Sequence, residues 1–192
     1  MDISKQQYDV ELDHHYTTIW GQRSAQTTWG RGPVLPQPCA VFEYAPSDKT
    51  FCWVYATCGM TPLVESAVLE VFLLSPCHTE SHVELLTAIA HYHQTGAALG
   101  LGHTVNFGRP WLEKSRCSFG LISLPYLFGP AVENASIAGR RVRVLWLLPI
   151  TSDERDFKVS SGLPALEELF ERQQFNYLDP MRRSVVEKLV RS

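Results

Sequence analysis

Two apolar runs, FCWVYAT at residues 51–57 and AVLEVFLL at residues 67–74, have the composition of buried β-strands. β-Branched and aromatic residues dominate the first run, and the second is apolar on both alternating faces except for Glu70. A strand that is apolar on both faces is typical of a sheet that is covered on two sides. We therefore expect both runs to lie inside a sheet that carries helices on its faces.

Further strands are expected on either side of these runs. Ala40–Tyr44 is rich in strand-forming residues, and the segment Ala45–Lys49 that follows it has the composition of a hairpin turn. The remaining strand-like runs are His103–Phe107, Ser118–Leu124 and residues 140–148. The last of them alternates between polar and apolar residues at first and then becomes wholly apolar, which predicts a strand that enters a core.

Helices are expected before and after these first strands. Residues 1–34 form a lead-in segment that is helical or irregular. Four large residues there fall near helical spacing: Tyr8, Leu12, Tyr16 and Ile19. A capping box of Ser81 and Glu84 predicts the start of a second helix, and Gly96 predicts its end. Its apolar face is expected to hold Leu85, Leu86, Ile89 and Tyr92.

The order of the elements favours one α+β domain. A last helix is expected to begin at Ser160 or Ser161, with Pro164 tolerated in its first turn. Strands outnumber helices and do not alternate with them strictly, so we expect a mixed or antiparallel central sheet with helices packed on its faces. The 192 residues show no internal repeat and no long linker, and they fit a single domain over residues 1–192.

The composition argues against several classes of protein. Hydrophobic residues make up 45% of the chain and charged residues 19%, which is typical of a globular protein and not of a disordered one. The formal net charge of −3 argues against a nucleic-acid partner, because phosphate contacts need clustered positive charge. No secretory signal and no membrane-spanning run is visible, so we expect a cytoplasmic protein whose five cysteines are reduced.

Candidate chemical sites are weak. His78 and His82 are four residues apart, but the predicted capping box leaves His78 outside the helix, so we expect no metal site. Cys58 follows a strand and could act as a nucleophile with His103 as its base, and this enzyme hypothesis stays open. The carboxylates of Asp153-Glu154 are expected to be solvated near a helix. The glycine-rich segment 96–102 lacks the residues of a phosphate-binding loop, and no cofactor is expected.

Six segments, taken in order, resemble the suppressor-of-fused family over residues 35–187. They are residues 51–61, which end in a turn like the family's Thr-Ser-Gly-Met-Ser, then 69–74, 83–92, 102–105, 144–154 and 179–186. The resemblance implies a fold similar to the amino-terminal domain of suppressor of fused, and a module that binds proteins without catalysis. Short single-domain relatives are typical of bacteria, where many look like immunity proteins that neutralise a toxin partner.

The resemblance also implies a binding role for Tyr92, which corresponds to a helix tyrosine that animal members present to a partner peptide. Their peptide-contacting aspartate and histidine correspond to Gly102 and Gly108 here, so the animal partner is not expected. A strand-rich domain can also accept a partner at a sheet edge, with the glycine-rich segment closing over it. The candidate partner-binding residues are Tyr92, His103, Asn106, Trp111, Arg182 and Arg183.

We therefore expect a protein of the bacterial immunity type that inhibits a toxin partner by binding it. Two alternatives stay open: an intracellular adaptor or regulator with a non-toxin partner, and an enzyme that depends on a cysteine or a histidine. A further open alternative is that Tyr92 and Trp111 are ordinary core or half-buried residues, since scattered surface aromatics are common.

Overall fold

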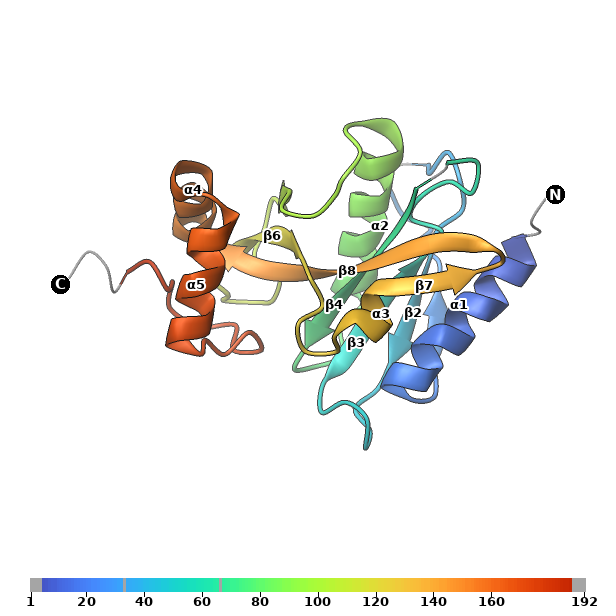
Figure 1. The fold of residues 1–192 in the computed structure, drawn as a ribbon, viewed down its shortest axis with the longest axis horizontal. Helices are drawn as coiled ribbons and strands as arrows, with labels where there is room; N and C mark the ends of the chain where they lie inside the picture. The colour runs from blue at the N-terminus through green and yellow to red at the C-terminus, as the bar shows by residue number, and fades with distance from the viewer. Residues whose placement is uncertain (1–4, 33, 66, 188–192) are drawn as a thin grey trace. The chain divides into compact units, whose positions relative to one another are not determined.

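The computed structural model describes residues 5–32, 34–65 and 67–187. Within them lies a mixed eight-stranded sheet in the order β1-β2-β3-β4-β8-β6-β5, with β7 paired to β8 outside this order (Figure 1). The strands are β1 (Ala25–Thr27), β2 (Ala40–Tyr44), β3 (Trp53–Cys58), β4 (Val68–Ser75), β5 (Thr104–Asn106), β6 (Cys117–Ser123), β7 (Asn134–Ile137) and β8 (Arg140–Thr151). The helices are α1 (Lys5–Trp20), α2 (Ser81–Thr95), α3 (Pro130–Glu133), α4 (Ser152–Ser161) and α5 (Leu163–Gln173). The expected α+β fold with a mixed sheet is therefore confirmed.

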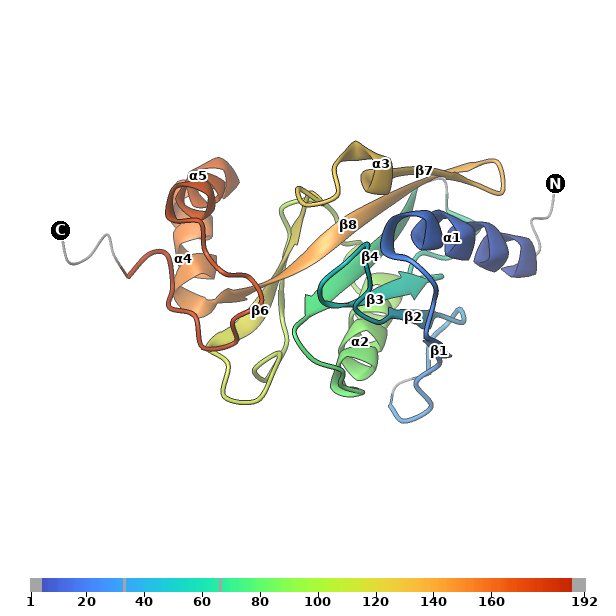
Figure 2. The same ribbon diagram turned by 90° about the horizontal axis from the view of Figure 1, so that it is seen from below.

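The described residues divide into two compact units. The first lies within Met1–Leu101 and Ser123–Trp146, and the second within Gly102–Ile122 and Leu147–Ser192, so that β8 contributes to both. In the first unit β1 to β4 pair antiparallel in sequence order, and β4 pairs parallel with β8. Helices α1 and α2 lie on opposite faces of β2, β3 and β4 (Figure 2). This two-sided cover explains why all eight residues of β4 are buried.

The buried face of α1 is aromatic. Tyr8, Leu12, Tyr16 and Trp20 recur every fourth residue and are fully buried. The ring of Trp20 lies 5.2 Å from that of Phe72 on β4, and the ring of Tyr16 lies 6.5 Å edge-on from that of Phe42 on β2. The sequence predicted Ile19 as the fourth residue of this helix face, and this prediction was wrong by one position. Trp20 continues the spacing of four, and Ile19 is only partly buried.

Glu70 is the one acidic residue in the apolar run of β4, and it joins three elements. Its carboxylate accepts hydrogen bonds from the Tyr8 hydroxyl of α1 (2.7 Å) and from the Thr57 hydroxyl of β3. It also accepts the backbone N–H groups of Gly59 (2.8 Å) and Met60 (3.1 Å) in the turn after β3. Gly59 has φ of +92°, and a Cβ there would lie 2.7 Å from the Pro38 carbonyl oxygen, so this turn requires glycine.

The β7–β8 hairpin closes through a strained two-residue turn. Ile137 pairs with Arg140, and the residues between them, Ala138 and Gly139, have φ of 49° and 73°. Positive φ at both central residues defines the hairpin turn that favours Asn-Gly. An alanine in this conformation costs about 1 kcal/mol.

Ala138→Asn is therefore expected to stabilise the protein by about 1 kcal/mol, because asparagine tolerates the left-handed conformation. Urea unfolding of the two proteins side by side measures the difference. The opposite change, Gly139→Ala, is the matched control, since nothing lies within 4 Å of a Cβ there and only backbone strain is added. It should destabilise by a similar amount, and a stabilising Gly139→Ala would contradict the assignment of the turn.

Helix starts differ from the sequence-based expectations in two places. The N-cap of α2 is Glu80 and not Ser81, whose hydroxyl lies 2.8 Å from that of Thr79, so the expected Ser81–Glu84 capping box is wrong. The expected helix start at Ser160 or Ser161 is also wrong. Those residues end α4, and α5 begins at Leu163 after Gly162.

The strand expectations hold better. Ala40–Tyr44 is confirmed residue for residue, and the last expected strand begins at Arg140 as expected but ends three residues later, at Thr151. The boundaries of the other four expected strands are displaced by one or two residues. Gly96 ends α2 as expected. The short elements β1, α3 and β7 carry too few apolar residues to be recognised from sequence, and α4 was missed. No helix among residues 5–32, 34–65 and 67–187 is long and apolar enough to cross a membrane.

Candidate functional site

Helix α2 carries both buried and exposed large residues. The expected inward residues Leu85, Leu86 and Ile89 are buried, which confirms them. Tyr92 is 48% exposed, so its expected place on the apolar face is wrong. Its ring instead packs beside Gly96, where a Cβ would lie 3.2 Å from the ring. The turn at Gly96 thus holds an exposed tyrosine in a defined position.

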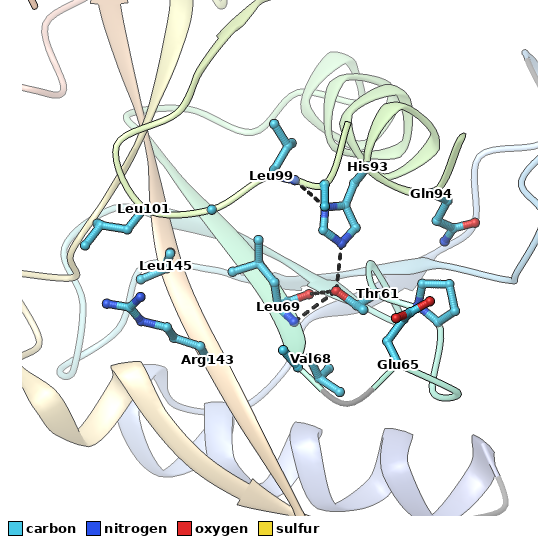
Figure 3. Close-up of a pocket in the computed structure, with 14 residues that line it drawn as sticks. Thr61, Glu65, Val68, Leu69, His93, Gln94, Leu99, Leu101, Arg143 and Leu145 are labelled. Atoms are coloured by element: carbon cyan, nitrogen blue, oxygen red, sulfur yellow. Dashed lines mark hydrogen bonds between the residues drawn. The ribbon is translucent and has the colours of Figure 1, made fainter. Parts of the chain in front are cut away.

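A cavity of about 430 Å³ lies beside this turn (Figure 3). Its walls come from four segments of the first unit: the connection between β3 and β4, the start of β4, the end of α2 with the segment after it, and β8. The lining residues are Thr61, Pro62, Glu65, Ala67, Val68, Leu69, His93, Gln94, Ala98, Leu99, Gly100, Leu101, Arg143 and Leu145. The mixture of aliphatic side chains with a few polar groups is typical of a small binding pocket.

The histidine in this cavity is held on both ring nitrogens. His93 Nδ1 accepts the backbone N–H of Leu99 at 2.9 Å, and Nε2 lies 2.9 Å from the Thr61 hydroxyl oxygen (Figure 3). Burial lowers the pKa of His93 below its usual value, and the nearby Glu65 carboxylate opposes this shift. His93 is therefore placed to be neutral in the folded protein at pH 7.

The next residue, Gln94, ties the same turn to two loops. Its side-chain amide donates to the carbonyl oxygens of Gln37, Gly59 and Met60 at 3.2–3.3 Å, and its side-chain oxygen accepts the Gln37 N–H at 3.0 Å. The end of α2 is therefore fixed to the turn after β3 and to the segment before β2. Across the cavity, Arg143 on β8 forms an ion pair with Glu133 at 2.8 Å.

Three of the expected partner-binding residues lie in or near the strand β5 of the second unit. His103 and Asn106 are exposed, and the Asn106 side chain accepts the Gly108 N–H at 2.8 Å. β5 ends the strand order of the sheet, so it is an edge strand. Trp111 is only 3% exposed, which corrects its expected role as a surface anchor, because its ring is part of the core.

The two neighbouring arginines of the closing motif have different environments. Arg183 is exposed, whereas Arg182 is 6% exposed and forms a bidentate pair with Glu154, with N···O distances of 2.6 and 2.7 Å. Burial acts to lower the pKa of Arg182, but the hydrogen bonds to Glu154 and the attraction of Glu154 and other nearby anionic groups together raise it. Arg182 is thus held inside the second unit, and the expected solvated state of Glu154 is wrong, because its side chain is fully buried.

Glu154 also organises the backbone around it. It accepts the N–H of Thr151 at 2.9 Å, and the Thr151 hydroxyl accepts the Glu154 N–H at 3.3 Å, which together form the capping box of α4. The N–H of Val185 donates to the same carboxylate at 3.0 Å. One buried acid therefore joins the start of α4 to the segment after α5.

The residues expected for an enzyme are not arranged for catalysis in the first unit. Cys58 is buried, and burial, together with the Glu70 and Asp9 carboxylates, raises the pKa of its thiol. A raised pKa opposes formation of the nucleophilic thiolate. The thiol donates to Asp9 at 3.1 Å, and all five cysteines of the chain are free.

The two histidines whose spacing raised the question of a metal site have protein partners. His78 Nε2 lies 2.9 Å from the Glu43 carboxylate, and His82 Nε2 lies 3.0 Å from the Ser75 hydroxyl. Among residues 5–32, 34–65 and 67–187, no three histidine, cysteine or acidic side chains are grouped to hold a metal ion.

Sequence reasoning missed most of the cavity. It singled out Tyr92 and the glycine-rich segment 96–102, but it assigned no role to Thr61, Gln94 or Arg143. The alternation of Leu99 and Leu101 with glycine was the available signal, because large apolar residues in an otherwise small-residue segment are placed to contact a core.

The comparisons with known proteins agree with this architecture. The family model described as suppressor of fused protein (SUFU) matches residues 36–183. A suppressor-of-fused homologue from Neisseria gonorrhoeae FA 1090 is 34% identical, with a TM-score of 0.82, and the match covers 94% of this chain and 98% of that one. No curated protein sequence matches this chain.

Two further solved structures share the fold at low sequence identity. One is the complex of Sufu with Fu, at 12% identity and a TM-score of 0.71, with 96% of this chain and 94% of that chain covered. The other is Drosophila Suppressor of Fused, at 13% identity and a TM-score of 0.70, with 96% of this chain covered. This chain covers 52% of the Drosophila protein and so spans about half of its length.

Proposed function

This chain belongs to the suppressor-of-fused family, and from that premise we propose that it is a non-catalytic, cytoplasmic module that binds a protein partner. The observation that carries the proposal is the exposed Tyr92, whose neighbours His93 and Gln94 line a cavity of about 430 Å³. The family resemblance implies that Tyr92 corresponds to the helix tyrosine that animal members present to a peptide. Tyrosine is among the residue types that contribute most to protein interfaces. The Sufu structure in complex with Fu supports a protein partner for members of this family.

We propose separate partner contacts in each unit. Tyr92 provides the anchor in the first unit. In the second unit, β5 offers an edge strand, and exposed His103, Asn106 and Arg183 offer polar groups. We leave Trp111 and Arg182 out of the binding residues because both are buried.

The partner that we propose is a bacterial toxin, which this chain neutralises by binding. The match to the Neisseria homologue supports a bacterial type, because it covers 98% of a chain of similar length. An adaptor or regulator with a non-toxin partner is the alternative within the same binding class.

Expression of the captured partner in a test bacterium, with and without this chain, separates these two roles. A toxin partner should arrest growth when expressed alone, and co-expression of this chain should restore growth. A partner whose expression leaves growth unchanged would reject the toxin and favour the adaptor.

Tyr92→Ala is expected to weaken partner binding by at least about tenfold, because removal of a central aromatic anchor costs more than about 1.4 kcal/mol. Isothermal titration of the purified partner with both proteins measures the change. Tyr126→Ala is the matched control, since Tyr126 is also exposed in the first unit and has no assigned role. Equal losses of affinity in both variants, or no loss in either, would contradict a specific role for Tyr92.

A further inference from the structure

His93 connects α2 to the glycine-rich segment that forms one wall of the cavity. The segment runs from Gly96 to Leu101, and its last four residues line the cavity. Its Leu99 N–H donates to His93 Nδ1 at 2.9 Å, and this bond is drawn in Figure 3. A backbone position in the segment is therefore held by a titratable side chain.

The hydrogen bonds define the protonation state of this imidazole. A ring nitrogen that accepts an N–H carries no proton, so Nδ1 is bare and the single proton of the neutral ring is on Nε2. Nε2 then donates to the Thr61 hydroxyl oxygen at 2.9 Å.

The Thr61 hydroxyl is compatible only with that direction. It donates its one proton to the Leu69 carbonyl oxygen and accepts the Leu69 N–H, both at 2.9 Å. One lone pair remains, and it accepts from His93. A second proton on the imidazole would sit on Nδ1 and face the Leu99 N–H, so that two donors would oppose each other and the bond would be lost.

We propose that His93 is a proton-sensitive latch, which in its neutral form holds Leu99 and the cavity wall in place and on protonation releases the segment from Gly96 to Leu101. Two glycines and two exposed alanines in this segment leave it free to change conformation once it is released. The latch is a regulatory device for the cavity, in which acidification opens one wall.

The charged groups around the cavity set the pH at which the latch responds. Glu65, from the connection between β3 and β4, favours the protonated ring. Arg143, from β8, lines the same cavity and is itself paired with Glu133. Burial lowers the pKa of His93 below its ordinary value of about 6.5. The latch is therefore intact above that value and is released as the pH falls through the lowered pKa.

A consequence for binding follows from the position of the latch, and this consequence rests on the proposed function. Tyr92 directly precedes His93, and the released segment follows it. A partner that contacts Tyr92 would therefore bind more weakly below the pKa of His93. The latch itself needs no partner and can be tested without one.

Nuclear magnetic resonance of the ¹⁵N-labelled full chain, followed from about pH 8 to about pH 5, tests the latch. The imidazole nitrogens report protonation of His93, and amide hydrogen exchange, corrected for its intrinsic pH dependence, reports the Leu99 bond. We expect the protection of the Leu99 amide to fall at least about tenfold, with the same midpoint as the titration of His93. A flat protection profile while His93 titrates would overturn the proposal, and so would a ring that stays neutral until the protein unfolds.

Two variants isolate the responsible group. His93→Asn places an uncharged oxygen near the position of Nδ1, where it can accept the Leu99 N–H without titrating, so protection should become independent of pH. His91→Asn, a change at a partly exposed histidine of the same helix, should keep the pH dependence. Equal pH dependence in His93→Asn would overturn the proposal, and if that variant fails to fold, the wild-type midpoints alone decide. If the latch is confirmed but partner binding does not weaken as His93 is protonated, that result counts against the proposed function and not against the latch.

Discussion

Arg182→Ala is expected to lower the free energy of unfolding by about 3–5 kcal/mol, the usual cost of breaking a buried ion pair from one side. The Glu154 carboxylate would lose both guanidinium hydrogen bonds and would stay fully buried with its charge unpaired. Arg182 also donates to the Pro149 carbonyl oxygen at 3.0 Å and lies 4.9 Å from the ring of Phe175. The variant therefore loses the contacts that join the segment after α5 to β8 and α4.

Urea unfolding monitored by circular dichroism measures this loss. Arg183→Ala is the matched control, because Arg183 is the exposed neighbour of Arg182 in the sequence, and it should change the stability by less than about 0.5 kcal/mol. If the two variants unfold at the same urea concentration, Arg182 does not stabilise the second unit as the geometry requires.

Glu70→Gln is expected to cost about 3 kcal/mol in the first unit. Each carboxylate oxygen accepts one hydroxyl and one backbone N–H: Tyr8 and Gly59 on Oε1, and Thr57 and Met60 on Oε2. An amide NH₂ in either position would face a backbone N–H that cannot reorient, and a buried donor left without an acceptor is costly. Burial raises the pKa of Glu70, and these four hydrogen bonds act in the opposite direction.

The same unfolding measurement applies, with Glu171→Gln on the exposed face of α5 as the control. Amide exchange at Gly59 and Met60 adds a local readout, because one of these two N–H groups loses its acceptor in the Glu70 variant, whereas neither does in the control. A Glu70→Gln protein as stable as the wild type would contradict the role of this carboxylate in joining α1, β3 and β4.

The strands were predictable because their patterns are local. Apolar runs such as residues 67–74 identify buried strands wherever they pair, and Gly96 ends a helix by its own backbone freedom. The acidic residue inside β4 was visible as an exception to the pattern. Its four donors were not, since Tyr8 lies 62 residues away in the chain and the other three lie 10 to 13 residues away, on the far side of a loop.

The site could be predicted only in part, for the same reason. Family resemblance gave Tyr92, whose exposure agrees with a surface role. Arg182 and Trp111 looked equally suitable in the sequence, but burial is decided by tertiary packing and not by residue type. The spacing of Thr151 and Glu154 is that of a capping box, and it would have predicted the start of α4. It would also have assigned Glu154 a partner, whereas its place beside Asp153 suggested a solvated carboxylate.

The enzyme alternative loses its main support from the same packing. Cys58 was attractive because a turn follows it, yet its thiol lies in the core beside Asp9 and its pKa is raised. A thiol titration of the folded protein is expected to show fast reaction at Cys77, the one exposed cysteine, and slow reaction at Cys58.

Quantitative affinity capture tests the proposed function most directly. The tagged chain is recovered from its own source cells in three forms: wild type, Tyr92→Ala and Tyr126→Ala. We predict that one protein is recovered in a stoichiometric amount with the wild type and with Tyr126→Ala, and at a strongly reduced amount with Tyr92→Ala. Recovery of the bait alone with the wild type, from cells shown to express candidate partners, would contradict a protein-binding function.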